Sequence, residues 1–249
     1  EENRNLRQTL TPPTGVSDLI GKSKEINAVK KMIRQSANSR ATVLIIGESG
    51  TGKEVVANTI HKNSLLHKAP FVVVNCGAIP ANLIESELFG YEKGAFTGAD
   101  RDRTGVFVKA QGGTVFLDEV ASMSPAFQGK LLRVLQEKVV RPVGSDHDVP
   151  VNFRLIAATN RDLDAMVKQG KFREDLFFRL MVVRVHIPPL RNRPKDILPL
   201  AMHFLRSQCL MCLGPGAATP EFAEETIQRL LRYDWPGNIR ELINAIEYA

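Results

Sequence analysis

The chain has 249 residues, of which 43% are hydrophobic and 24% are charged, and its formal net charge is +6. This length suffices for one large domain with a small satellite, and the composition is that of an ordinary globular protein. No apolar run approaches the roughly 18 residues that cross a bilayer, and the polar start of the chain is unlike a secretory signal. These features exclude a membrane span and predict a cytoplasmic protein.

Three cysteines, Cys76, Cys209 and Cys212, are an odd number in a domain too large to need disulfides, and they favour a reducing compartment. Cys209 and Cys212 form a C-x-x-C pair, but no second cysteine pair accompanies it, so we do not expect metal or redox chemistry there. The basic residues are scattered along the chain. The positive charge is therefore only a weak indication of nucleic-acid binding.

The first 16 residues lack apolar periodicity and include Pro12, Pro13 and Gly15, a composition that is typical of a linker. We interpret residues 1–16 as a linker from an upstream regulatory domain. At the other end, the chain stops within a predicted helix, and we expect further protein to follow it.

Five short apolar runs alternate with helical patterns in the body of the chain, at residues 42–46, 71–74, 114–117, 153–158 and 181–187. This alternation predicts an α/β fold over residues 17–190, with a mostly parallel sheet covered by helices on both faces. After Pro188 and Pro189, three helical stretches follow without strands, at residues 194–208, 220–233 and 237–249. They predict a small all-helical lid over residues 191–249.

The first apolar run leads into residues 47–54, GESGTGKE, which match the G-x-x-x-x-G-K pattern of a phosphate-binding loop (P-loop). Glycines let backbone amides turn toward phosphate oxygens, and Lys53 can reach the β and γ phosphates of ATP. Glu54 stands where serine or threonine usually binds Mg²⁺, so the metal must find other ligands. The alternative is a glycine-rich turn that merely caps a helix. The predicted ATP-binding residues here are Gly47, Glu48, Ser49, Gly50, Thr51, Gly52, Lys53 and Glu54.

A second motif, residues 112–119 with the sequence GGTVFLDE, is a buried-looking strand that ends in two carboxylates. Asp118 is suited to hold Mg²⁺, directly or through water, and Glu119 can polarise the water that attacks the γ phosphate. The alternative for such a pair is a helix N-cap. The predicted nucleotide site also includes Ala110, Gly112 and Gly113, which come before the strand.

Two further apolar runs end in uncharged polar residues, namely Asn75 and the pair Thr159 and Asn160. Their side chains can hydrogen-bond a phosphate oxygen, a water or a carboxylate, and we assign them to sensing the γ phosphate. Helix caps or turn residues are an equal alternative for each of them taken alone.

Between the two nucleotide motifs, residues 87–99 read ELFGYEKGAFTGA, and here the sequence resembles the sigma-54-dependent activators, the bacterial enhancer-binding proteins, whose signature is GAFTGA. The resemblance runs from about Val16 to the end of the chain, through GESGTGKE, FLDE and the closing WPGNIREL at residues 235–242. The family also carries glutamate at the position of Glu54. The resemblance implies an AAA+ ATPase that uses ATP and Mg²⁺ to remodel RNA polymerase carrying sigma-54.

The resemblance also implies roles for particular residues. The loop that contacts sigma-54 is Gly94, Ala95, Phe96, Thr97, Gly98 and Ala99, with Phe96 and Thr97 central. Without the family, an ordinary hairpin turn is favoured over an interface for this loop. Its height is expected to follow the nucleotide state, with Asn75 as a relay that holds or releases Glu119.

Further residues follow from the same resemblance. Arg173 and Arg179 act in trans on the γ phosphate of a neighbouring subunit, which implies a ring, usually a hexamer; solvated surface arginines are the alternative. Arg240 reaches the nucleotide in cis from the lid. Ile20 and Gly21 belong to the adenine pocket.

Two other functions stay open at this point. One is a different AAA+ enzyme, such as a chelatase, a helicase loader or an unfoldase. The other is a regulatory DNA-binding module that uses ATP only as an assembly signal. Because no helix-turn-helix pattern is evident in the sequence, we assign enhancer DNA to a C-terminal domain beyond it. A two-component receiver is the commonest upstream partner in the family.

Overall fold

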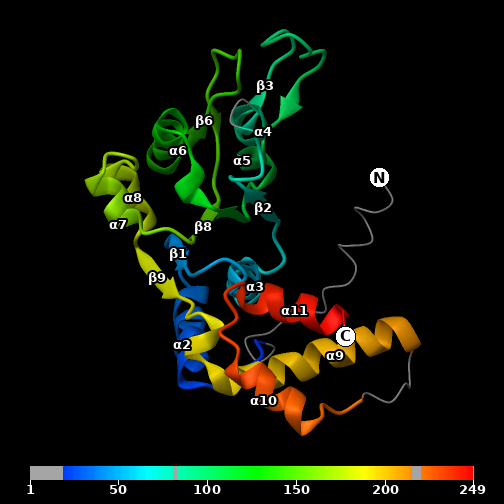
Figure 1. Ribbon diagram of the computed structural model, residues 1–249. Helices are drawn as coiled ribbons and strands as arrows, with labels where there is room; N and C mark the ends of the chain where they lie inside the picture. The colour runs from blue at the N-terminus through cyan, green and yellow to red at the C-terminus, as the bar shows by residue number, and fades with distance from the viewer. Residues whose placement is uncertain (1–18, 81–82, 215–219, 249) are drawn as a thin grey trace.

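The computed structural model describes residues 19–80, 83–214 and 220–248 (Figure 1). The predicted linker over residues 1–16 lies outside these ranges. Within them, no helix is both long enough and apolar enough to pass through a membrane.

The centre of the molecule is a five-stranded parallel sheet with the strand order β2-β5-β8-β1-β9. Each strand coincides with one of the five apolar runs in the sequence to within two residues, so the predicted sheet is confirmed. The strands are β1 (Val43–Ile46), β2 (Phe71–Asn75), β5 (Thr114–Asp118), β8 (Arg154–Thr159) and β9 (Val183–His186). Because all five run in the same direction, their carboxyl ends meet at one edge of the sheet.

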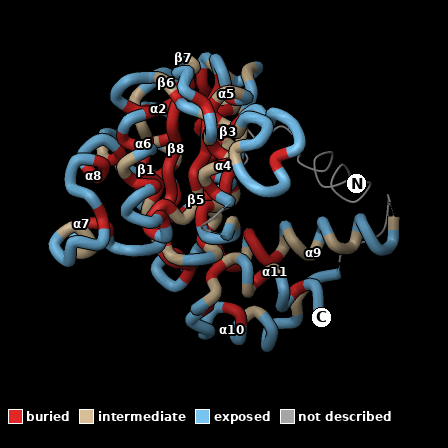
Figure 2. The backbone as a smooth tube through the Cα atoms, turned by 90° about the horizontal axis from the view of Figure 1, so that it is seen from above, coloured by how far each residue is buried: buried red, intermediate tan, exposed pale blue. Residues whose placement is uncertain are grey.

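Helices cover both faces of the sheet. Successive residues of a strand point to opposite sides, so each face carries apolar side chains that a layer of helices buries. Leu117 packs into the core under one group of helices, whereas its neighbour Phe116 packs into the core under the other group. The first group is α4 (Ile84–Phe89), α5 (Val106–Lys109), α6 (Pro125–Glu137), α7 (Leu163–Lys168) and α8 (Glu174–Leu180). The second group is α2 (Lys24–Ala37) and α3 (Lys53–Lys62). Figure 2 shows β5 and β8 as a buried centre between these layers.

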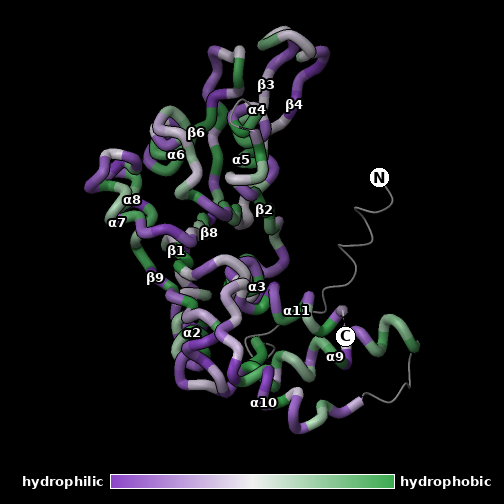
Figure 3. Tube along the Cα trace, viewed as in Figure 1, coloured by the Kyte–Doolittle hydropathy of each residue, from purple (hydrophilic) through white to green (hydrophobic). Residues whose placement is uncertain are grey.

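Two short hairpins extend from this body side by side. The first pairs β3 (Gly90–Tyr91) with β4 (Arg103–Thr104), and the second pairs β6 (Val139–Val140) with β7 (Val149–Pro150). Tyr91 forms a bridge to Val143 of the second hairpin. Stretches of hydrophilic residues lie at the ends of both hairpins (Figure 3). We name the pair the twin hairpins.

The predicted helical lid is also present. Two short 3-10 turns, η3 (Leu190–Asn192) and η4 (Pro194–Asp196), lead into α9 (Ile197–Leu213), α10 (Glu224–Arg232) and α11 (Asn238–Tyr248). The lid has its own core, which includes Leu200, Leu230 and Leu242. Trp235 is buried in it and donates from its indole nitrogen to the Leu230 carbonyl at 2.8 Å.

Candidate nucleotide site and hairpin tip

The P-loop connects β1 to α3 at the carboxyl edge of the sheet. Gly50 and Gly52 have φ angles of +77° and +96°, a left-handed conformation that side chains other than glycine rarely adopt. A Cβ at Gly50 would lie only 2.2 Å from the carbonyl oxygen of Gly237 in the lid. The backbone N–H of Gly47 donates to the Thr159 carbonyl at 3.1 Å, which ties the start of the loop to β8.

Lys53 begins α3 and is 9% exposed. Its Nζ donates to the carbonyl oxygens of Gly47 and Glu48, each at 3.1 Å. Burial lowers the pKa of Lys53, and the nearby carboxylates of Asp118 and Glu119 act in the opposite direction. A buried ammonium inside a loop of backbone amides is a site for a phosphate group.

Asp118 and Glu119 lie at the same edge of the sheet, at the end of β5. Asp118 pairs in register with Asn75 of β2, and its Oδ1 accepts the backbone N–H of Glu119 at 2.9 Å. Glu119 has φ +55°, which is costly for a residue other than glycine. It begins a short 3-10 turn over residues 120–122, but its side chain makes no capping bond, so capping does not explain the carboxylate pair.

Gly77 is a site residue that sequence reasoning missed. A Cβ there would lie 2.0 Å from Oε2 of Glu119 and 3.4 Å from Oδ1 of Asn75. The Glu119 carboxylate therefore occupies the space that a side chain at position 77 would need. A single glycine outside any motif carries no signal in the sequence that could have identified it.

The polar residues assigned to phosphate sensing also make turn contacts. Oδ1 of Asn75 accepts the N–H groups of Gly77 and Ala78 at 2.9 and 3.1 Å. In the described part of the chain, no hydrogen bond joins Asn75 to Glu119, so the relay remains a prediction. Oγ1 of the buried Thr159 accepts the N–H of Arg161 at 3.0 Å.

A cavity of about 270 Å³ opens beside Thr159 and Asn160. Apolar side chains from β1 and from the region of α8 form much of its lining, namely Leu44, Ile46, Phe177 and Met181. The other lining residues include Arg161, Asp162 and Asp164, but no residue of the P-loop lines the cavity. The cavity therefore adjoins the P-loop edge without being the phosphate site itself.

A magnesium ion would depend mainly on Asp118. Among the described residues, no group of three or more histidine, cysteine, aspartate or glutamate side chains could hold a metal. Glu54 is exposed on the first turn of α3. Mg²⁺ commonly takes one or two carboxylates and completes its shell with phosphate oxygens and water, so the carboxylate of Asp118 could serve as such a ligand.

The lid brings Arg240 to the P-loop of the same chain, where its guanidinium donates to Oγ of Ser49 at 3.0 Å. Ile20 packs against the lid core, and Gly21 has φ +128°. A Cβ at Gly21 would lie 2.7 Å from the carboxyl carbon of Asp196, a buried residue at the start of the lid. Arg240 therefore contacts the P-loop from the lid, whereas Ile20 and Gly21 lie against residues of the lid and of the turn before it, and their roles in nucleotide binding remain predictions.

Arg173 and Arg179 lie at the two ends of α8. Arg173 forms an ion pair with Asp175, which raises the pKa of Arg173, and Arg179 donates to the Leu135 carbonyl at 3.1 Å. Among the described residues, neither arginine makes a hydrogen bond or an ion pair with the P-loop of its own chain. Figure 1 shows α8 at the side of the sheet away from the lid helices.

The structure does not bring Ala110, Gly112 and Gly113, which were predicted to belong to the nucleotide site, to the P-loop edge. These residues precede β5, and the N–H of Gly112 donates to the Asn152 carbonyl at the amino edge of the sheet. The five residues of β5 separate this edge from Asp118 by roughly 13 Å. Strand β5 therefore places Asp118 near the P-loop and places the glycines that precede the strand at the opposite edge of the sheet.

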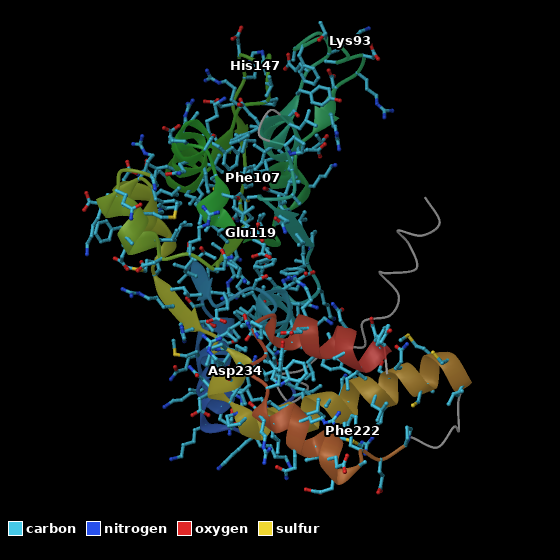
Figure 4. All side chains as sticks on the ribbon, in the orientation of Figure 1. Lys93, Phe107, Glu119, His147, Phe222 and Asp234 are labelled. Carbon is cyan, nitrogen blue, oxygen red and sulfur yellow. The ribbon has the colours of Figure 1, made fainter. Side chains whose placement is uncertain are left out.

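The loop of residues 94–99 forms the exposed tip of the first hairpin. Backbone bonds close it, with the Gly94 N–H donating to the Ala99 carbonyl at 2.8 Å. The Phe96 ring packs edge-on against Tyr91 at 4.9 Å between centroids, yet 42% of Phe96 stays exposed. In Figure 4 the neighbouring Lys93 and His147 mark the ends of the two hairpins, well away from Glu119.

The second hairpin supports this tip, and sequence reasoning did not identify it. The N–H of Glu92 donates to the Val143 carbonyl at 3.0 Å, and the N–H of Val143 donates to the Gly90 carbonyl at 2.9 Å. Gly144 has φ +82° and lies against Ala95. A Cβ added at position 144 would lie 2.7 Å from the Cβ of Ala95. In the sequence, the cluster of Pro142, Gly144 and Ser145 hints at a turn.

Comparison with known proteins agrees with this arrangement. Residues 19–186 match the family model described as the sigma-54 interaction domain, and residues 191–249 match the AAA+ ATPase lid domain. The chain is 48% identical to the nitrogen fixation protein AnfA of Azotobacter vinelandii over 248 residues, which are 100% of this chain and 46% of AnfA. It is 51% identical to the transcriptional regulatory protein ZraR of Escherichia coli K12, covering 93% of this chain and 52% of ZraR.

Solved structures show the same fold. NtrX from Brucella abortus in complex with ATP superposes with a TM-score of 0.85 at 36% sequence identity, over 99% of this chain and 52% of NtrX. NtrX has also been solved with ADP, with a TM-score of 0.86. The chain thus spans about half the length of the relatives it matches. It belongs to the sigma-54 interaction domain family, the AAA+ P-loop NTPase domain of the bacterial enhancer-binding proteins.

Proposed function

We propose that this chain hydrolyses ATP and uses the energy to convert the closed promoter complex of sigma-54 RNA polymerase into the open complex. One observation carries the proposal. A buried P-loop lysine and a carboxylate pair lie at one edge of the sheet, and an exposed, glycine-bracketed tip lies on hairpins that extend from the same body. A motor needs both a site for chemistry and a separate surface for its partner.

The hydrolytic step is assigned to residues at the carboxyl edge of the sheet. Lys53 holds the phosphates, and Glu119 polarises the attacking water as a general base. Asp118 binds Mg²⁺, which neutralises charge on the phosphate oxygens. Thr159 and Asn160 sense the γ phosphate, and Arg240 contacts the nucleotide from the lid.

The site is completed by a second copy of the chain. Arg173 and Arg179 are exposed on α8, and each can reach the γ phosphate held by a neighbouring subunit. An arginine supplied in trans contributes roughly 10³-fold or more to the rate of such reactions. We therefore propose a ring, with six subunits as the expected number.

The partner assignments follow from the family. The tip over residues 94–99 contacts sigma-54, with Phe96 and Thr97 central. Enhancer DNA and a two-component receiver are assigned to the parts of the relatives that this chain does not cover. A different AAA+ activity would share the nucleotide residues but would have no use for the GAFTGA sequence of the tip.

The test is ATP turnover as a function of protein concentration, followed by capture of sigma-54 in the presence of ADP and aluminium fluoride, which mimics the transition state. We expect turnover per subunit to rise with concentration, to stop when EDTA removes Mg²⁺, and to accompany analogue-dependent capture. The matched control is Lys53→Ala, which should neither turn over ATP nor capture sigma-54. Turnover without capture would contradict the partner assignment, and no turnover at any concentration would contradict the enzyme.

A further inference from the structure

Three successive carbonyl groups of the P-loop are held by residues of the lid and of the turn that leads into it. These carbonyls belong to Ser49, Gly50 and Thr51. Their donors are the side-chain amide of Asn238 at 3.0 Å, the backbone N–H of Ile239 at 2.9 Å and the guanidinium of Arg193 at 3.2 Å. The two preceding carbonyls, of Gly47 and Glu48, accept instead from Lys53.

Holding these carbonyls also sets the direction of the phosphate-facing amides. A peptide unit is planar and trans, so its C=O and the N–H that follows point in opposite directions. Fixing the carbonyl of Ser49 fixes the N–H of Gly50, and the next two carbonyls fix the N–H groups of Thr51 and Gly52. These amides belong to the turn in which backbone N–H groups surround phosphate oxygens, and that of Thr51 also donates to the Glu48 carbonyl at 3.4 Å. The lid thus controls the orientation of the groups that a phosphate would meet.

Asn238 is the centre of this contact. It is fully buried, and its φ of +54° is a left-handed conformation that asparagine adopts more readily than most residues. Its Oδ1 accepts the Leu190 N–H at 2.8 Å, while its Nδ2 donates to the Ser49 carbonyl and to Oε2 of Glu48 at 3.2 Å. One amide side chain thus joins the lid, the turn before it and the P-loop.

An exposed ion pair adjoins Asn238. Arg191 donates to both carboxylate oxygens of Glu48, at 2.9 and 2.5 Å, and this hydrogen bonding holds the pKa of Glu48 below its ordinary value. Solvent screens such a pair, so it contributes little by itself. The buried contacts of Asn238 and Arg193 are the stronger part of the connection, because a buried group that loses its partner is costly.

We infer that Asn238 and Arg193 are positioning residues that preorganise the P-loop for the polyphosphate of the nucleotide. This inference rests on the proposed binding of ATP and adds a determinant of its affinity. Removing the Asn238 amide should weaken binding of ADP and ATP about tenfold, which corresponds to about 1.4 kcal/mol. Binding of adenosine should change less than about twofold, because adenosine has no phosphate to meet the P-loop amides.

The experiment measures the dissociation constants of ATP, ADP and adenosine for the unchanged chain and for two variants. Asn238→Asp keeps the acceptor for Leu190 but cannot donate to Ser49. Asn238→Gly keeps the left-handed backbone and adds no negative charge, so it separates loss of the amide from electrostatic repulsion. Tyr233→Phe is the matched control, since it removes a lid hydrogen bond to Glu241 that does not involve the P-loop. Circular dichroism checks that each variant is folded.

Weaker ADP and ATP binding with unchanged adenosine binding in Asn238→Gly would support the inference. Equal weakening of all three ligands would overturn it, because that pattern marks a general loss of the lid. Unchanged ADP binding in both variants would overturn it as well. If the unchanged chain bound neither ADP nor ATP, the proposed function would fail together with the inference, and this outcome is distinct from the other two.

Discussion

The P-loop and the hairpin tip are both glycine-rich loops, but their surroundings differ completely. The carbonyls of residues 47–51 all accept hydrogen bonds, and a Cβ at Gly50 would collide with the lid. At Gly94 and Gly98 of the tip, no described atom lies within 4 Å of a Cβ. The glycines of the P-loop therefore permit close approach, whereas those of the tip lie in open space in a left-handed conformation.

The two loops therefore differ in how strongly their surroundings restrict their conformation. A phosphate site benefits from donors that are already oriented, because no reorganisation is then needed when charge arrives. A tip that follows a nucleotide state must change its position, so few packing contacts should oppose its motion. The contact between Phe96 and Tyr91 and the packing of Ala95 against Gly144 anchor one side of the tip, while Gly94, Thr97 and Gly98 stay exposed.

The largest effect is expected at the preorganised edge. Glu119→Gln removes the base and keeps the size of the side chain, so ATP turnover should fall roughly 10²- to 10⁴-fold. ATP affinity should stay within about threefold, because Lys53 and the P-loop are unchanged. Phosphate release and binding of a fluorescent ATP analogue measure the two quantities. Turnover above a tenth of the original rate would exclude Glu119 as the base.

A smaller and separate effect is expected at the tip. Thr97 is exposed, and Thr97→Ala should leave ATP turnover within about twofold while open-complex formation falls at least about tenfold. Heparin-resistant transcription from a sigma-54 promoter, measured beside phosphate release, gives both values. Parallel loss of the two activities would show that tip and nucleotide site do not have separate roles.

The contact between the twin hairpins allows an intermediate test. Gly144→Ala places a Cβ 2.7 Å from that of Ala95 in a left-handed conformation, so the free energy of unfolding should fall by about 1 to 2 kcal/mol. Capture of sigma-54 should weaken several-fold, while ATP turnover is retained. Urea unfolding and analogue-dependent capture test this, and unchanged capture would show that the second hairpin does not support the tip.

The smallest effect should come from a glycine in neither loop. Gly129 lies within α6, and no described atom lies within 4 Å of a Cβ at that position. Gly129→Ala should therefore stabilise the chain by about 0.5 to 1 kcal/mol, since alanine loses less conformational entropy in a helix. The same urea titration measures it. If Gly129→Ala lowered the free energy of unfolding instead, replacing a glycine would destabilise this chain even without a steric contact. A loss of stability in Gly144→Ala would then no longer indicate the contact with Ala95.

The sequence by itself determined the sheet, the lid and the core of the nucleotide site. Buried parallel strands are continuous apolar runs, and residues that follow such runs meet at one edge whatever the details of packing. This rule placed Lys53, Asp118 and Thr159 at the edge of the sheet where the structure has them. The same motif also contains Ala110, Gly112 and Gly113, but β5 separates them from the P-loop edge, because a shared motif does not place its two ends together.

Only the tertiary structure decided the rest. The twin hairpins have strands of two residues each, which are too short to show a period, and their pairing depends on contacts such as that between Glu92 and Val143. Gly77 lies against the side chain of Glu119, and Asn238 donates to the carbonyl of Ser49, so the role of each depends on a residue distant in the sequence. Hydrogen bonds between the lid and the P-loop join residues nearly 190 positions apart, and no local pattern encodes a partner at that separation.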